Sequence, residues 1–198
     1  MYQYNKVRSE QQSRARLGEQ RVANWFSRLE GVEDIEILED YGYSNRSIES
    51  IQGHKDNMLN RLGIDLIVKY RYWYLNIDIK TFTYNSKHYG EIDSEGRVGS
   101  LLVQVEDRFK GEGWGLTDKL THRLAIYILG KGLYVFDRLE FTSTVRKYLD
   151  QVEAKDIIEF RKGRSQLRDN IEKCIRIPLS QFNITRYVPE HELVKAEC

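Results

Sequence analysis

The chain has 198 residues, a length that suits one ordinary domain with a single core rather than two independent cores. Apolar residues make up 40% and charged residues 31%, and no apolar run approaches the ~20 residues of a membrane-spanning helix, which excludes transmembrane and wholly disordered classes. Basic and acidic residues nearly balance, 31 against 30, so a polyanionic partner would have to be bound by a local basic patch.

Cysteine content and the first residues bear on the compartment. Two cysteines, Cys174 and Cys198, are too few for a disulfide framework or a four-ligand structural zinc site. The polar start, MYQYNK, leads into a charged stretch without the apolar segment of a secretory signal. We therefore expect a cytoplasmic protein in a reducing compartment, with no membrane partner.

The first element that the sequence predicts is a helix. From Arg8 to Leu29, apolar side chains recur with helical spacing, and Gly31 is expected to end the helix. Glu19 lies three residues before Val22 in this apolar stripe, so its carboxylate is expected on the buried face or at its margin. A carboxylate in that position needs a partner.

The next segments predict a strand, a loop and a hairpin. Residues 32–38 alternate loosely in polarity and favour a short strand, whereas residues 39–61 are rich in Ser, Asn, Gly and charge, as in a long loop. Two runs rich in β-branched and aromatic residues, 63–70 and 73–80, are separated only by Arg71-Tyr72. This is the strongest hairpin signal in the chain.

The second half of the sequence predicts further strands and one helix. In chain order we expect a loop at 87–99, a strand at 101–105, a loop at 110–115, strands at 124–129 and 133–136, a helix at 142–152, a basic polar segment at 156–170 and a strand at 174–179. The two strands joined by Gly130-Lys131-Gly132 form a second hairpin, and their apolar character on both sides favours central positions in a sheet. Pro178 favours an edge position, or the end of a strand, for the last of these strands.

The residues with the clearest chemistry lie on the first hairpin. A tight turn at Arg71-Tyr72 pairs Asp65 with Asp78 across the strands, and alternation puts Asp78 and Lys80 on one face. Opposed carboxylates about 5 Å apart repel each other unless a cation lies between them or one is protonated. Oxygen ligands suit Mg²⁺ or Mn²⁺, and Lys80 would then lie beside a metal-bound water and a phosphate. The pattern therefore predicts hydrolysis of phosphodiester bonds.

These residues also carry a resemblance to a known family. Asp65, followed after twelve residues by Asp78-Ile79-Lys80 and preceded by a helix with Glu19, resembles the PD-(D/E)XK nuclease superfamily, which has the restriction-endonuclease-like fold. The order of elements is also similar: a helix, a hairpin, a third strand at 101–105, and a Gly-Trp loop leading into an apolar strand. The resemblance spans roughly residues 14–136.

The resemblance implies an α/β fold with a central mixed β-sheet flanked by helices. It implies that Asp65 and Asp78 are metal ligands assisted by the Ile79 carbonyl, that Lys80 is the catalytic lysine, and that Glu19 reaches the metal directly or through water. Residues 1–198 would form a single nuclease domain, with a core of about 10–180 and a basic helical or loop segment at about 140–170. The expected activity is that of a Mg²⁺-dependent DNA endonuclease, restriction-like or associated with a phage or mobile element. Many relatives act as homodimers.

Several alternatives stay open at this point. The chain could be a catalytically inactive nucleic-acid-binding or assembly module of the same fold, or a nuclease acting on RNA or branched DNA. Glu19 could instead form an ion pair with Arg16 or Arg21, and Gln104 could be an ordinary strand amide rather than a further active-site group. The four histidines share no short spacing, which argues against a zinc site.

Basic residues in three segments are candidates for phosphate binding. They are Arg8, Arg14 and Arg16 near the first helix, Lys55 and Arg61, with Asn57 and Asn60, in the loop before Asp65, and Arg161, Lys162, Arg164 and Arg168 later in the chain. The loop before Asp65 is expected at the mouth of the active site. No base-reading side chain can be identified among these residues.

Overall fold

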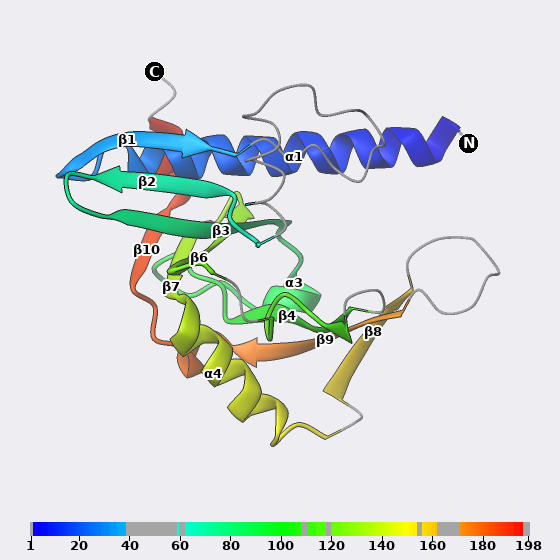
Figure 1. Ribbon diagram of the computed structural model, residues 1–198. Helices are drawn as coiled ribbons and strands as arrows, with labels where there is room; N and C mark the ends of the chain where they lie inside the picture. The colour runs from blue at the N-terminus through cyan, green and yellow to red at the C-terminus, as the bar shows by residue number, and fades with distance from the viewer. Residues whose placement is uncertain are drawn as a thin grey trace. The chain divides into compact units, whose positions relative to one another are not determined.

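The structure of this α/β protein is a computed structural model that describes residues 2–38, 59, 62–107, 111–117, 120–153, 156–161 and 171–195. Its strands form a six-stranded mixed sheet and a four-stranded sheet, accompanied by helices (Figure 1). The chain divides into two compact units, which we call the first unit (residues 1–83, 119–136 and 185–198) and the second unit (84–118 and 137–184). The expectation of a single nuclease domain stays a prediction.

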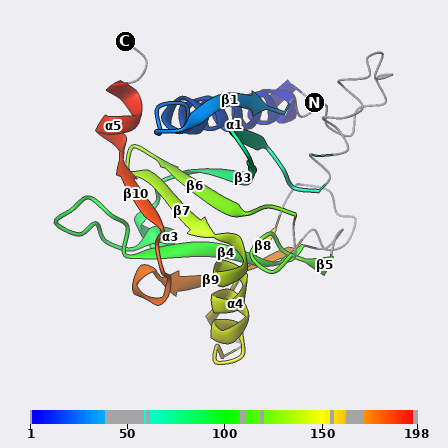
Figure 2. The same cartoon turned by 60° about the vertical axis from the view of Figure 1, so that its left-hand side comes forward.

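The first unit contains the six-stranded sheet. Its elements are α1 (Tyr2–Phe26), β1 (Val32–Ile37), β2 (Leu66–Tyr70), β3 (Tyr74–Thr83), β6 (Arg123–Leu129), β7 (Gly132–Asp137), β10 (Arg186–Pro189) and α5 (Glu190–Val194). The strand order is β1-β2-β3-β6-β7-β10, and β3 and β6 are a parallel pair between antiparallel neighbours. Figure 2 shows β3, β6, β7 and β10 side by side, with α5 following β10 near one end of α1. The predicted central positions of the second hairpin's strands are confirmed.

The first hairpin has the register that its sequence predicts. Leu66 pairs with Ile77 and Lys69 with Tyr74. The Tyr70 amide donates to the Trp73 carbonyl at 2.9 Å, which closes the tight turn. The predicted strand at 73–80 continues to Thr83, so β3 extends well past the point where β2 begins.

Helix α1 covers the face of the sheet that carries Ile77 and Ile79. Val22 and Phe26 are buried in one core cluster with these two residues. Gly18 lets the helix backbone approach β3 closely, because a Cβ at this position would overlap the Thr81 hydroxyl oxygen. The predicted helix is therefore confirmed, although it begins at Tyr2 and its regular part ends at Phe26. Glu19 is half-buried, in agreement with a place at the margin of the stripe.

The second unit contains the four-stranded sheet, in the order β5-β4-β9-β8. Its elements are α3 (Ser86–Tyr89), β4 (Ser100–Asp107), β5 (Gly111–Glu112), α4 (Arg138–Leu149), β8 (Ile157–Arg161), β9 (Ile171–Pro178) and the 3₁₀ helix η2 (Leu179–Gln181). All of its strand pairs are antiparallel. Helix α4 contributes an aromatic residue to the core of this unit, since Phe141 stacks on Phe182 with 4.8 Å between the ring centroids.

The strand at 101–105 does not join the hairpin's sheet, which corrects the sequence-based expectation. It is part of β4, whose sheet neighbours are β5 and β9, whereas β3 is flanked by β2 and β6. The physical reason lies in the burial of the two strands. β6 is buried on both faces and suits a parallel neighbour, while β4 alternates between buried and half-buried residues and suits an antiparallel sheet with one covered face.

Three further expectations are corrected in the second unit. Residues 157–161 form β8 rather than an irregular basic segment, and 86–89 form a short helix within the expected loop. The prediction of an edge or a strand end for Pro178 is confirmed in its second form, because β9 ends at Pro178 while lying between β4 and β8. Helix α4 begins at Arg138 rather than 142, because the Asp137 side chain accepts hydrogen bonds from the first backbone amides.

Two predicted segments lie outside the described residues. They are most of the loop at 39–61, including Lys55, Asn57, Asn60 and Arg61, and the basic residues Lys162, Arg164 and Arg168. Among the helices that the structure does describe, none has the length and apolar character needed to cross a bilayer.

Candidate active site

The candidate site lies where β2 begins beside the middle of β3. The Asp65 amide donates to the Ile77 carbonyl at 2.9 Å, although the ladder pairs Ile77 with Leu66, so the regular register of the hairpin ends at Leu66. The next hydrogen bond between the two strands involves a side chain, because Asp65 Oδ2 accepts a hydrogen bond from the Ile79 amide at 2.7 Å. This bond fixes the Asp65 carboxylate beside the backbone of β3.

Asp78 is fully buried, with 0% of its surface exposed, and Lys80 supplies a partner for it. The Lys80 ammonium Nζ donates to Asp78 Oδ1 at 2.5 Å and to the Ile79 carbonyl oxygen at 3.2 Å. A buried carboxylate needs such a partner, because its desolvation is otherwise uncompensated. The predicted placement of Asp78 and Lys80 on one face of β3 is thus accompanied by direct contact.

The same ammonium also lies 3.9 Å from Asp65 Oδ2. One cation therefore adjoins the two carboxylates and the carbonyl that the resemblance assigns to a metal. With both carboxylates ionised, the three side chains carry a net negative charge, which favours a further cation. Asp65 and Lys80 have 22% and 23% of their side chains exposed, so the cluster reaches solvent through these two residues.

The donor set fits a hard divalent cation. Carboxylate and carbonyl oxygens suit Mg²⁺ or Mn²⁺, and Mg²⁺ commonly takes only one or two carboxylates and keeps several waters. Across the described ranges, no group of three or more His, Cys, Asp or Glu side chains is arranged to hold a metal ion. Among the described residues, the oxygens next to the Lys80 ammonium belong to Asp65, Asp78 and the Ile79 carbonyl.

Glu19 lies on α1, next to Gly18, whose backbone approaches Thr81 of β3. Helix α1 faces Ile77, Ile79 and Thr81, whereas alternation directs Asp78 and Lys80 to the opposite face of β3. The assignment of Glu19 as a metal ligand stays a prediction. Arg21, one of its two proposed ion-pair partners, contacts Glu190 at 2.9 Å.

A second polar cluster lies on the α1 face, and sequence reasoning missed it. Arg21 Nη1 donates to the Tyr127 hydroxyl at 2.5 Å, and that hydroxyl donates to Glu190 Oε1 at 2.7 Å. Burial of the Tyr127 ring, together with the Glu190 hydrogen bond, raises the pKa of Tyr127 to about 12. A tyrosine within the otherwise apolar run of β6 was the available signal. The cluster joins α1, β6 and α5 and therefore has a structural role.

Two other residues complete the account of the sequence candidates. Gln104 lies on β4, in the sheet of the second unit, so it does not share a sheet with Asp65 and Asp78. Arg14 donates to the Thr83 hydroxyl at 3.1 Å on an exposed surface near the end of β3. His122, which no pattern singled out, accepts a hydrogen bond at Nδ1 from the Asn76 amide at 3.0 Å.

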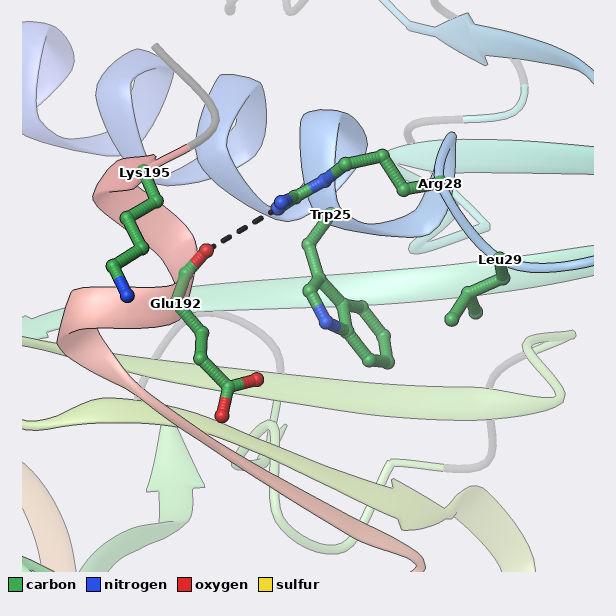
Figure 3. Close-up of a pocket in the computed structure, with 5 residues that line it drawn as sticks. All are labelled: Trp25, Arg28, Leu29, Glu192 and Lys195. Atoms are coloured by element: carbon green, nitrogen blue, oxygen red, sulfur yellow. Dashed lines mark hydrogen bonds between the residues drawn. The ribbon is translucent and has the colours of Figure 1, made fainter. Parts of the chain in front are cut away.

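A small pocket in the first unit is separate from this chemistry. It has a volume of about 240 Å³ and lies between the end of α1 and α5, where Arg28 donates to the Glu192 carbonyl at 3.4 Å (Figure 3). Its lining consists of Trp25, Arg28, Leu29, Glu192 and Lys195. None of the candidate active-site residues lines this pocket.

Comparisons with family models, curated proteins and solved structures found no match to this chain.

Proposed function

We propose that this chain is a metal-dependent nuclease of the PD-(D/E)XK type that hydrolyses phosphodiester bonds in DNA. The observation that carries the proposal is the meeting of Asp65, Asp78 and the Ile79 carbonyl around a single ammonium group, that of Lys80. A cation already lies next to the oxygens that would bind a metal. This arrangement is the expected one for a site that must hold positive charge beside a phosphate.

Asp65, Asp78 and the Ile79 carbonyl would hold Mg²⁺ or Mn²⁺. The bound metal would supply Lewis acidity and make water a stronger nucleophile near neutral pH. The hydrogen bond from the Ile79 amide to Asp65 Oδ2 orients that carboxylate before any ligand arrives. Pre-orientation of this kind lowers the reorganisation needed when substrate binds.

Lys80 has the role that most distinguishes this site from an ordinary ion pair. Its side chain is partly exposed, so the ammonium can exchange its contact with Asp78 for a phosphate oxygen of the substrate. An ammonium at that place stabilises the negative charge that develops on the phosphate and orients the attacking water.

The proposal includes DNA as substrate, a cytoplasmic location and a restriction-like or mobile-element role. A homodimer is the assembly that would cut both strands of a duplex at once. A nuclease that prefers RNA or branched DNA has the same active-site chemistry, because all of these substrates present the same phosphodiester group.

The test is cleavage of supercoiled plasmid in Mg²⁺, in Mn²⁺ or in EDTA. We expect nicking or linearisation with either metal and none with EDTA. Asp78→Asn should abolish cleavage, whereas Asp34→Asn, an exposed aspartate on β1 of the same sheet, should cleave as the parent chain does. Nucleic-acid binding without cleavage of plasmid, RNA or branched DNA would contradict the proposal and favour the inactive binding module.

A further inference from the structure

The tip of the β2–β3 hairpin exposes an unusual amount of aromatic surface. Tyr72 is 82% exposed, Trp73 50% and Tyr74 58%. We call Arg71, Tyr72, Trp73 and Tyr74 the aromatic tip. Three consecutive large rings at a solvent-exposed turn are atypical of a surface without a partner, since such patches mark binding sites.

Two rings of the aromatic tip each have one face in contact with a neighbouring side chain. Trp73 stacks on Tyr70 across the strands, with ring centroids 4.0 Å apart and planes within 6°. The Arg71 guanidinium lies 5.0 Å from the centre of the Tyr72 ring. The tight turn and the stacked pair limit the motion of these side chains, so little further ordering is needed when a flat partner binds.

The aromatic tip itself carries positive charge and no negative charge. Lys69 and Arg71 contribute two positive charges within the turn, and the residues from 69 to 74 include no carboxylate. The acidic residues Glu33 and Asp34 belong to the adjacent strand β1, where Asp34 pairs with Lys69 in the ladder. Exposed aromatic rings beside an arginine are typical of surfaces that stack unpaired bases.

The aromatic tip and the candidate active site belong to one strand. Tyr74 lies four residues before Asp78, so alternation places both side chains on the same face of β3, with Cα atoms about 13 Å apart. A nucleic-acid strand with its phosphate at Lys80 could therefore continue along the hairpin and place a nearby base on Tyr74. The distance corresponds to a few nucleotides of an extended strand.

We propose that the aromatic tip binds unpaired bases by stacking, so that the substrate has a single-stranded segment next to the bond that is cut. This inference rests on the proposed nuclease function and adds the class of substrate. A fully paired duplex keeps its bases stacked on one another and offers the rings only a terminal pair. Single-stranded DNA, or a duplex with an unpaired segment, offers base faces directly.

Fluorescence anisotropy with labelled oligonucleotides tests the inference, with EDTA present so that no cleavage occurs. The probes are a single strand, a blunt duplex and the same duplex with a single-stranded overhang. The full chain should bind the single strand and the overhang more tightly than the blunt duplex. Tyr72→Ala combined with Tyr74→Ala should weaken binding of the single strand about tenfold or more and leave binding of the blunt duplex nearly unchanged.

Two control variants separate stacking from other effects. Tyr72→Phe combined with Tyr74→Phe keeps both rings and should retain the affinity of the parent chain, because stacking does not need the hydroxyl groups. Leu139→Ala removes an exposed apolar side chain elsewhere, on α4, and should have no effect on binding. Unchanged single-strand affinity in the double alanine variant would overturn the inference, as would binding by the tip to anionic lipid vesicles or to a second copy of the chain instead of to oligonucleotides.

The two proposals can fail separately. Loss of single-strand binding in the alanine variant, without metal-dependent cleavage of any substrate by the parent chain, would support the aromatic tip and contradict the nuclease. Metal-dependent cleavage that does not depend on the rings or on an unpaired segment would support the nuclease and overturn the role of the tip.

Discussion

Two lysine–carboxylate pairs in this chain use the same chemical groups in different surroundings. On the first unit, Lys80 contacts Asp78 at 2.5 Å, with 23% and 0% of the two side chains exposed. On the second unit, Lys173 of β9 contacts Glu106 of β4 at 2.7 Å, with 38% and 50% exposed. The distances are alike, whereas burial differs greatly.

A second carboxylate and greater burial distinguish the Lys80 cluster, the candidate reaction site, from the surface ion pair of Lys173. Asp65 lies 3.9 Å from the Lys80 ammonium, so that lysine serves two acids and a carbonyl. Lys173 contacts only a solvent-exposed carboxylate in its ion pair with Glu106, and exposed pairs of this kind contribute little to stability. Each prediction below tests part of this contrast.

The largest expected effect on stability comes from Lys80→Met. Without the ammonium, the buried Asp78 carboxylate close to Asp65 loses the positive charge that Lys80 supplies, and the free energy of unfolding should fall by about 3 kcal/mol. If the same oxygens bind a divalent cation, Mg²⁺ or Mn²⁺ should restore part of this loss, because a ligand that binds only the folded state stabilises it. Urea unfolding with and without metal measures both effects.

The matched control for that experiment is Lys173→Met. It should change neither the urea midpoint nor the response to metal, because this pair is exposed. An equal metal response in Lys80→Met and Lys173→Met would contradict the assignment of the metal ligands.

Gly18→Ala tests the packing that holds β3 in place. A Cβ would overlap the Thr81 hydroxyl, and overpacking of this kind should lower the free energy of unfolding by about 1–3 kcal/mol. Adding Thr81→Ala should recover part of the loss by removing the overlapping oxygen. Thermal and urea unfolding of the single and double variants provide the measurement, and an unchanged Gly18→Ala stability would refute the close contact of α1 with β3.

Tyr127→Phe tests whether the buried polar cluster on the α1 face takes part in cleavage or only stabilises the fold. The variant loses hydrogen bonds to Arg21 and Glu190, so it should be less stable by about 1–2 kcal/mol while cleaving plasmid at the parent rate. Folding raises the pKa of Tyr127 from 10.0 to about 12, so its contribution is complete below pH 10 and is lost as the pH rises through 12. The stability difference between parent and variant should narrow over that interval, and a constant difference would contradict the burial of the hydroxyl.

The smallest expected effect concerns Lys173. The hydrogen bond and the charge of Glu106 raise the pKa of Lys173 above its usual value of 10.5. Glu106→Gln should therefore lower this pKa, as an NMR titration of the side-chain ammonium would detect, without affecting cleavage. The small stabilisation is present below the unfolded-state pKa and is lost as the pH rises above it. A pKa that does not change in the variant would show that the pair does not form in solution.

Local patterns allowed the core of the first unit to be predicted. The tight turn at Arg71-Tyr72 sufficed to predict the register of β2 with β3 as far as the pair Leu66 and Ile77, because an antiparallel register follows from its turn. The continuous apolar run of β6 indicated a central strand for the same kind of reason. The Asp137 side chain that begins α4 was also readable as a helix cap, although the sequence interpretation placed the helix start later.

Long-range features could not be predicted in this way. β4 pairs with β9, although the two strands are far apart in the sequence. The residues of one strand do not specify its partner, so this pairing could not be predicted from either strand alone. Tyr127 and its partner Arg21 are 106 positions apart in the sequence, and no local spacing links them. The hydrogen bond from the Ile79 amide to the Asp65 carboxylate forms where the pairing of β2 with β3 ends, so it could be identified only from the structure.

The most direct test of the central claim is plasmid cleavage by Lys80→Met and Lys173→Met side by side, in Mg²⁺, with folding of each variant checked by circular dichroism. The account predicts that the parent chain and Lys173→Met cleave alike and that Lys80→Met is at least ~100-fold slower, the usual scale for losing a positioned catalytic group. Cleavage by folded Lys80→Met at the parent rate would contradict it.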